Sequence, residues 1–430
     1  MFLKLAGKVK DILPKSKFSK NVIKIISGTG LGHLVSLFFY PILTRLYDPA
    51  EFGTLAVFVS FLSIISVIAS LRYEFAIPLA PNNRNAINVL FLSLCVLFII
   101  TTIIGITLSS TGGYITTLIG VENLYPYLWA VPIGVMFFGL FQNLNFWAVR
   151  VQQFKVLSIA KFFQALGVVL TQLALFSIGA GGLIIGHITG YATASIILFL
   201  LLRNQLKSLK RHFQITKLFE LAKRYAKFPL ISSFSGLINS LGLYIPAILL
   251  TTFYSVEVAG FFTLTQRVIS APLTLIGKSI AQVYYSEVTN GLKTNPSEVR
   301  RLFKNTVGKL FLFSVIPITL FCITAPFLFA TIFGEEWRET GVYISYLAPL
   351  IVMQFVVNPI SQTLLILEKQ FLQLIWDVCR LILVFSTFFF LQNSDPTYTI
   401  FVYGISMSIA YLLMLCISYW QLSVKIKEGG

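Results

Sequence analysis

Charged residues are scarce in this sequence, and acidic residues are the scarcer of the two kinds. Only 11% of its 430 residues are Asp, Glu, Lys or Arg, whereas a typical soluble domain has about 25%. Hydrophobic residues make up 56% of the chain. Too few polar residues remain to cover the surfaces of the two or three soluble domains that such a length would form. The composition therefore excludes a soluble globular protein and indicates an integral membrane protein.

Cysteine and histidine are also rare, which leaves few candidates for metal or covalent chemistry. The four cysteines are scattered through apolar segments without the spacing of a metal site, and they imply no disulfide. The sequence contains no glycine-rich phosphate loop and no nucleophile with a base nearby. We therefore expect no metal, no cofactor, no catalytic residue and no enzymatic activity.

Long stretches without charge predict how many helices cross the membrane. A spanning helix needs about 20 apolar residues, and the charge-free windows hold ten such helices. Two further apolar stretches are interrupted, one by Arg267 and Lys278 and the other by Asp377 and Arg380. The predicted spans are 22–44, 52–75, 84–109, 124–149, 156–178, 182–202, 229–252, 257–284, 305–332, 341–366, 370–392 and 398–422. The predicted fold class is all-α, a polytopic membrane protein with twelve transmembrane helices.

The distribution of the positive charges predicts the orientation. Of the 33 Lys and Arg residues, 28 fall on the side that holds the N-terminus, two fall on the other side, and three lie within spans. Lys and Arg collect on the cytoplasmic side of membrane proteins, so we place both termini in the cytoplasm. This bias explains most of the net charge of +17 without a nucleic-acid partner, and membrane lipids are the nearer partners of the basic loops.

A basic segment at the midpoint divides the chain into two halves. Residues 203–228 carry eight Lys and Arg and include an amphipathic stretch, so we interpret them as a cytoplasmic linker. The other predicted parts are a basic cytoplasmic segment at 1–20, an N-terminal six-helix lobe at 21–202, a C-terminal six-helix lobe at 229–424 and a cytoplasmic tail at 425–430.

A weak internal repeat supports this division. A shift of 207 residues aligns spans one and two with spans seven and eight. The motif Tyr-x5-Gly then recurs, at Tyr47 and Gly53 and again at Tyr254 and Gly260. Because each half has six helices, both halves start on the same side, and the repeat is parallel, with its pseudo-two-fold axis along the membrane normal.

Glycine and proline in spans one and seven are candidates for bending points. Such residues permit kinks that a rocking transporter would use, and close helix packing without motion is the alternative explanation. The candidates are Gly28, Gly30, Gly32 and Pro41 in span one, and Gly236, Gly242 and Pro246 in span seven.

Cations inside the predicted spans are the main candidates for a binding site. A charge in the membrane costs about 2.5–3.5 kcal/mol on insertion scales, so such residues are candidates for function. Arg267 lies about 15 Å into its span at 1.5 Å per residue, and Lys278 shares its helix face. With Arg380, and with Arg72 at the inner end of span two, they suit an anionic group, phosphate in particular. For Lys278 the alternative is a side chain that reaches the inner interface.

Three further ionisable residues are candidates for ion coupling. Asp377 and Arg380 are three residues apart and face each other on a helix, which fits either a self-neutralised pair or an ion-coupled switch. Glu74 follows Arg72 at the inner end of span two. His33 lies among the glycines of span one, where a helix–helix hydrogen bond is the alternative to a role in transport.

Two segments of the first half resemble a known family. They read Arg45-Leu46-Tyr47-Asp48-Pro49-Ala50-Glu51-Phe52-Gly53 and Ser70-Leu71-Arg72-Tyr73-Glu74-Phe75-Ala76-Ile77. They are similar to the Wzx-type oligosaccharide flippases of the multidrug/oligosaccharidyl-lipid/polysaccharide exporter (MOP) superfamily. The length, the twelve spans, the central basic loop and the Tyr-x5-Gly turn extend the resemblance over essentially the whole chain.

The resemblance implies a function in surface-polysaccharide assembly, such as that of O-antigen and lipopolysaccharide. It implies translocation of an undecaprenyl-diphosphate-linked oligosaccharide from the inner to the outer leaflet of the bacterial cytoplasmic (inner) membrane. Alternating access between the two halves, with ion coupling, would move this polyprenyl-diphosphate-linked substrate. Polysaccharide polymerase machinery is a further implied partner.

Two alternatives from other classes remain open. A drug or cation antiporter of the same superfamily would need a membrane carboxylate, and spans one and seven contain none. A membrane glycan polymerase or ligase usually carries a large external loop. The predicted external loops are all short, the longest being about 14 residues around 110–123. The sequence therefore favours the flippase over both.

Overall fold

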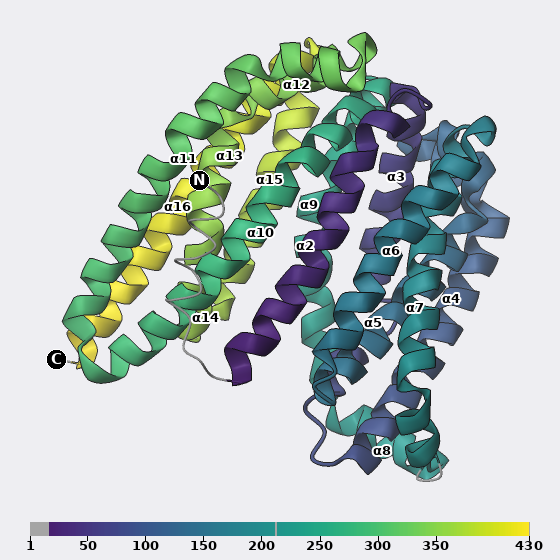
Figure 1. Cartoon of the computed structure of the whole chain (residues 1–430), viewed down its shortest axis with the longest axis vertical. Helices are drawn as coiled ribbons and strands as arrows, with labels where there is room; N and C mark the ends of the chain where they lie inside the picture. The colour runs from purple at the N-terminus through teal and green to yellow at the C-terminus, as the bar shows by residue number, and fades with distance from the viewer. Residues whose placement is uncertain (1–16, 211–212, 430) are drawn as a thin grey trace.

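The computed structural model describes residues 17–210 and 213–429, which form helices joined by short connections, with no β-strand among them (Figure 1). The first half contains α2 (Lys17–Leu43), α3 (Pro49–Ser66), α4 (Asn83–Ile119), α5 (Ala130–Arg150), α6 (Phe154–Ala174) and α7 (Ala180–Lys210). A short helix, α8 (Ile215–Arg224), leads into the second half. That half contains α9 (Ser233–Phe253), α10 (Val256–Thr294), α11 (Pro296–Phe333), α12 (Arg338–Tyr346), α13 (Ala348–Ile360), α14 (Gln362–Ile366), α15 (Gln370–Phe390) and α16 (Pro396–Gly429).

The long helices run in alternating directions, so the connections gather at two ends of the bundle (Figure 1). We call the end that carries α8 the α8 face and the end that carries α12 the α12 face. Helix α2 begins and α16 ends at the α8 face. An even number of spans requires this arrangement.

The helices account for the predicted spans. Among the described residues, ten helices are long and apolar enough to cross a membrane. Helix α2, with its apolar part Gly30–Leu43, and α10, which Arg267 and Lys278 interrupt, complete the predicted twelve. The prediction of an all-α membrane protein with twelve spans in two lobes is confirmed.

Several predicted span ends are wrong. Helix α3 ends at Ser66 rather than at residue 75, and the chain then turns through Leu71 and Arg72, whose φ angles are 48° and 59°. A right-handed helix cannot continue through such left-handed residues. Arg72 and Glu74 therefore lie in the connection between α3 and α4 and not in a span.

Helix α4 is longer than predicted. It runs to Ile119 instead of residue 109, and Gly120 ends it with a φ of 73°. The polar run at residues 109–111 does not break the helix because its hydroxyls donate to carbonyls within the same helix, Thr111 to Thr107 over 2.8 Å for example. The predicted span 341–366 is instead divided between α12, α13 and α14.

The two halves repeat the same local contacts at the α12 face. Tyr47 donates its hydroxyl to the carbonyl of Gln172 in α6 over 2.6 Å, and Tyr254 donates to the carbonyl of Leu391 after α15 over 2.5 Å. Each tyrosine thereby ties the start of the second helix of its half to the end of the fifth. The next residue in each half, Asp48 or Ser255, caps the helix that follows.

The glycines of the two Tyr-x5-Gly motifs lie where α3 crosses α10. A Cβ on Gly53 would overlap the carbonyl of Val256, and a Cβ on Gly260 would overlap the carbonyl of Pro49. Pro49 and Val256 are themselves 207 residues apart. The contact is therefore reciprocal, as a two-fold axis passing between α3 and α10 requires, and only glycine permits this approach of the backbones.

Two hydrogen bonds also join the halves at the α12 face. Trp337, after α11, donates its indole N–H to the carbonyl of Thr44 over 2.9 Å. Thr252, near the end of α9, donates to the carbonyl of Ile119 at the end of α4 over 2.6 Å. In each case the first helix of one half meets the end of the third helix of the other half. The two halves are thus in direct contact at this face.

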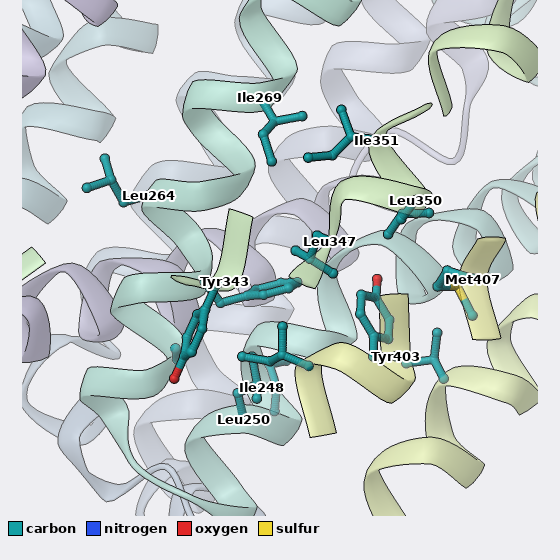
Figure 2. Packing of buried hydrophobic residues seen from close by; sticks show 14 of the residues in the cluster. Ile248, Leu250, Leu264, Ile269, Tyr343, Leu347, Leu350, Ile351, Tyr403 and Met407 are labelled. Carbon is teal, nitrogen blue, oxygen red and sulfur yellow. The ribbon is translucent and has the colours of Figure 1, made fainter. Parts of the chain in front are cut away.

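Apolar packing holds the second half together. Figure 2 shows side chains from α9, α10, α12, α13 and α16 gathered into one cluster, with Tyr403 and Met407 of α16 among them. Tyr343 and Leu347 are almost fully buried within it, with 2% and 1% of their surface exposed. This packing connects the helices of the second half that line the cavity described next.

Candidate functional site

A cavity of about 400 Å³ lies between α3 of the first half and several helices of the second half. It is lined by Ala56, Val59, Ser60, Gly242, Leu243, Tyr244, Ala247, Phe262, Thr263, Gln266, Arg267, Ser270, Gln354, Arg380, Tyr403, Met407 and Tyr411. The lining combines aromatic rings, amides, hydroxyls and two guanidinium groups. Such a mixture can stack against and hydrogen-bond a sugar while it holds an anion.

Arg380 enters the cavity from α15 and is held on several sides. Its Nη2 lies 3.0 Å from Oδ1 of Asp377, one turn earlier. Its guanidinium stacks on the Trp376 ring at 4.8 Å and donates weakly to Asn239 of α9. A Cβ on Gly242 would come within 2.9 Å of Nη2, so this glycine leaves room for the guanidinium. Although Arg380 is only 5% exposed, its Nε has no hydrogen-bond partner among the described residues.

Arg267 enters the cavity from α10 and is less constrained. It is half-buried, and its Nη1 donates to the hydroxyl of Tyr40 in α2 over 3.4 Å. Its guanidinium also lies 5.8 Å from the centre of the Tyr40 ring. Arg267 thus contacts the first half, while Arg380 belongs to the packing of the second half.

The charge of the cavity is positive. Of the described residues that line it, Arg267 and Arg380 are the charged ones, and Asp377 lies behind Arg380 at 3% exposure. Two guanidinium groups facing a shared space attract an anion, because their charge is poorly screened in a partly buried site. The geometry therefore suits an anionic ligand better than a cation.

The other predicted cations lie elsewhere. Lys278 is exposed and does not line the cavity, although it shares a helix face with Arg267. Lys278 instead lies near Lys161 of α6 and His33 of α2, close enough for electrostatic interaction with both. Lys161 has further contacts of its own, and sequence reasoning did not single it out.

Arg72 lies at the α8 face and joins the two halves. Its guanidinium stacks on Phe75 at 5.0 Å and fills the space that a Cβ on Gly236 of α9 would need. Phe75 itself stacks on Phe228, at the start of the second half, with 6.5 Å between ring centres. Burial raises the pKa of the nearby Glu74 carboxyl to about 7, although the charge of Arg72 opposes this shift.

The predicted bending points have different surroundings. Gly32 packs against the backbone of Lys161 in α6, whereas Gly236 and Gly242 each make room for an arginine. Pro41 and Pro246 lie inside continuous helices. Gly30 is buried, and Gly28 lies two residues earlier in α2. Their role as hinges remains a prediction.

Sequence reasoning missed the aromatic and amide lining. Tyr244, Tyr403 and Tyr411 come from α9 and α16, and Gln266 and Gln354 from α10 and α13. No spacing links these residues along the chain, so only the packing of the helices reveals that they meet. Among the described residues, no group of three His, Cys, Asp or Glu side chains could hold a metal ion.

Comparison with known proteins identifies a family and a fold. The family model described as polysaccharide biosynthesis protein matches residues 42–341. No curated protein matches the sequence. An inward-facing multidrug resistance transporter of the MATE family, in the MOP superfamily, is similar in structure, with a TM-score of 0.73 and 15% identity over 94% of this chain and 96% of that one.

Two further solved structures share the fold. The lipid II flippase MurJ, in an inward closed conformation, has a TM-score of 0.71 and 12% identity, over 94% of this chain and 90% of that one. A MOP-superfamily transporter from Pyrococcus furiosus, described as having a binding pocket of reverse polarity, has a TM-score of 0.65 and 13% identity, over 95% and 96%.

The fold and the family match define the class of the protein. The chain has the fold of the MOP-superfamily flippases and transporters, and the predicted resemblance to that superfamily is confirmed. Within it, the chain belongs to the polysaccharide biosynthesis protein family, whose model covers most of its length. It is a multi-pass membrane protein.

Proposed function

We propose that this protein is a flippase that moves a polyprenyl-diphosphate-linked oligosaccharide from the cytoplasmic to the outer leaflet of the bacterial inner membrane. The observation that carries the proposal is the pairing of Arg267 and Arg380 in one cavity that also offers tyrosines and amides. Membership of the polysaccharide biosynthesis family supports a glycan as the cargo. The α8 face would be cytoplasmic, because the Lys and Arg residues of the loops concentrate there.

The substrate has three chemical parts, and each has a suitable environment. The diphosphate would bind the two guanidinium groups, which match phosphate geometry better than ammonium groups do. The sugars would stack on Tyr244, Tyr403 and Tyr411 and bind the amides. The polyprenyl chain would stay in lipid. No covalent bond forms or breaks, so the protein would act by differential exposure of one site and not as an enzyme.

Alternating access would carry the bound group across. The halves touch at the α12 face through Gly53, Gly260 and the two hydrogen bonds from Trp337 and Thr252. Separation of these contacts would open the cavity toward that face. The pseudo-two-fold relation between α3 and α10 supports a rocking motion of one half against the other.

Ion coupling would follow from the contact between Asp377 and Arg380. When the diphosphate takes Arg380, Asp377 loses its counter-charge, and an uncompensated buried carboxylate is costly. Uptake of a proton or another cation by Asp377 would restore neutrality. An Asp377→Asn variant should therefore transport at a rate that no longer depends on the ion gradient; a rate that still follows the gradient would exclude Asp377 from coupling.

Binding measurements on the purified protein test the choice of substrate. Polyprenyl diphosphate carrying an oligosaccharide should bind more tightly than the matching monophosphate, because the diphosphate reaches both guanidinium groups. Arg380→Gln should remove this difference. Tighter binding of small organic cations than of either lipid would instead favour the cation antiporter.

A further inference from the structure

Helix α8 is fixed to the first half along one side. Leu221 is 3% exposed and belongs to an apolar cluster of that half. Tyr73 donates its hydroxyl to the carbonyl of Ala222 over 3.2 Å. The backbone N–H of Gln214 donates to Oδ1 of Asn88 in α4 over 2.9 Å. These contacts hold α8 in place at the end of the bundle (Figure 1).

A second apolar edge of α8 faces away from the protein. Ile215 is 73% exposed and Phe219 is 82% exposed, and the two lie one turn apart. At about 100° per residue, they extend the apolar sector that begins with the packed residues Leu218, Leu221 and Ala222. The apolar sector then spans roughly 160° of the helix, of which the protein covers only the part around these three residues.

The rest of the helix and the residues after it are basic. Residues 213–228 contain the cations Lys217, Lys223, Arg224 and Lys227, against one acidic residue, Glu220. Lys223, Arg224 and Lys227 are exposed. On the helix, Lys223 borders the exposed apolar edge on the side away from the packed residues. An exposed apolar edge beside exposed cations is the pattern of a helix that lies in the membrane interface.

The position of α8 makes the membrane surface its neighbour. It connects α7 to α9, and both helices belong to candidate membrane spans. At the start of that next span, Leu230 and Ile231 are also 75% and 64% exposed. The exposed apolar edge of α8 is therefore followed, within the next few residues, by further exposed apolar side chains at the start of a candidate span.

We propose that α8 binds anionic phospholipid of the adjacent leaflet. Ile215 and Phe219 enter the boundary between headgroups and acyl chains, and Lys223, Arg224 and Lys227 bind the phosphate-bearing headgroups. Charge complementarity selects anionic over zwitterionic lipid, because basic residues near a membrane surface are attracted by its negative potential. The inference does not depend on what the transporter carries. It makes α8 a surface that ties the first half to the leaflet.

Spin labels on neighbouring positions of α8 test the apolar edge. Phe219→Cys and its matched control Glu220→Cys would be made in a full-length chain whose four native cysteines are replaced by alanine. In bilayers that contain phosphatidylglycerol, the label at 219 should collide more often with oxygen and the label at 220 more often with a water-soluble nickel chelate. Ile215→Cys gives the same test if Phe219→Cys does not fold.

Three outcomes are distinguishable. Easy access of the nickel chelate to position 219 would overturn the proposal. Protection of position 219 from both reagents would also overturn it, in favour of a protein partner or a second copy.

The lipid preference is tested by the combined variant Lys223→Gln, Arg224→Gln and Lys227→Gln. In the parent, the label at position 219 should lie deeper in bilayers with phosphatidylglycerol than in bilayers of phosphatidylcholine alone, and the variant should remove this difference in depth. An unchanged difference would exclude these cations.

Discussion

The two halves of this protein are alike at the α12 face and different in the cavity. At the α12 face, residues 207 positions apart make equivalent contacts. Tyr47 and Tyr254 bind carbonyls, and Gly53 and Gly260 allow α3 and α10 to meet. In the cavity, the residue that corresponds to Arg267 by this shift is Ser60, which also lines the space.

Under the proposed function, this difference would separate the contacts that change during transport from the residues that bind the substrate. A symmetric contact between helices suits a rocking motion, since equivalent residues of both halves form it. A charged site needs no symmetry, and the second half supplies both of its guanidinium groups. Substitutions of the paired tyrosines and glycines should therefore change the conformational equilibrium or the stability. Substitutions of Arg267 and Arg380 should change substrate binding.

The largest effect is expected when the cavity is made symmetric. Arg267→Ser gives the second half the residue of the first, and should lower surface glycan or transport roughly ten- to a hundredfold, the equivalent of one hydrogen bond to a charged group. The variant should still insert in the membrane. Arg338→Ser is the matched control, because Arg338 is exposed at the α12 face and pairs only with Glu335 among the described residues. Normal glycan display by Arg267→Ser would remove Arg267 from the site.

A Cβ at the crossing of α3 and α10 should shift the conformational equilibrium of the two halves. Gly53→Ala or Gly260→Ala places a methyl group against a backbone carbonyl, and overpacking of this kind costs about 1–3 kcal/mol. Both variants should favour separation at the α12 face and should transport several-fold more slowly. Gly277→Ala in α10 is the control, because no described atom lies within 4 Å of its Cβ position.

The accessibility of reporter cysteines to an impermeant reagent tests this prediction. Reporter cysteines at the α12 face should react faster with an impermeant reagent in Gly53→Ala and Gly260→Ala than in the parent or in Gly277→Ala. If one glycine variant reacts as the parent does, the two halves are not equivalent at the crossing.

A second difference between the halves predicts a pH effect on stability. Glu74 lies at the α8 face, and the residue that corresponds to it by the shift of 207 is Ala281, inside α10. Burial raises the pKa of Glu74 from 4.5 to about 7 in the folded protein. The folded state then binds more protons at Glu74 than the unfolded state does between these values, so the contribution of Glu74 to stability is fully present below about 4.5 and is lost as the pH rises through about 7.

Glu74→Gln should flatten this dependence. Thermal unfolding at pH 5.5 and pH 8 should differ in the parent by on the order of 1–3 kcal/mol and hardly at all in the variant. An equal pH dependence in both proteins would mean that Glu74 titrates as an exposed carboxyl.

The smallest effects should come from the paired tyrosines. Tyr47→Phe and Tyr254→Phe each remove one hydrogen bond to a carbonyl, which is worth about 1 kcal/mol. If the repeat is symmetric in energy as well as in geometry, the two variants should lose similar amounts in thermal unfolding. A much larger loss for one would show that one half holds the α12 face together.

The number of membrane-spanning helices could be predicted from the sequence, whereas the residues that form the cavity could not. Ten of the twelve spans follow from charge-free windows and the other two from apolar stretches that a few charges interrupt, because a helix that crosses lipid must satisfy its own backbone and needs about 20 apolar residues. Their ends did not follow, since the turn through Leu71 and Arg72 and the continuation of α4 to Ile119 depend on local backbone angles and hydroxyl contacts.

The site required tertiary packing. The sequence places Arg267 and Arg380 inside predicted spans, but their shared cavity depends on how α10 and α15 pack against α9. Lys278, eleven residues beyond Arg267, was grouped with it by helix periodicity. Helix periodicity predicts which face of the helix a residue occupies, but not whether two residues on that face lie close together. Eleven residues correspond to about 16 Å along the helix, and Lys278 lies near His33 and Lys161 instead.

Transport by the purified protein in vesicles tests the central claim most directly. Vesicles would carry a polyprenyl-diphosphate-linked oligosaccharide in one leaflet, and its appearance in the other leaflet would be followed with an impermeant glycan-modifying enzyme. We expect rapid transfer by the parent protein and by Arg338→Ser, and transfer roughly ten- to a hundredfold slower by Arg267→Ser. Equal transfer by the parent and Arg267→Ser, or transport of small organic cations in place of the lipid, would contradict it.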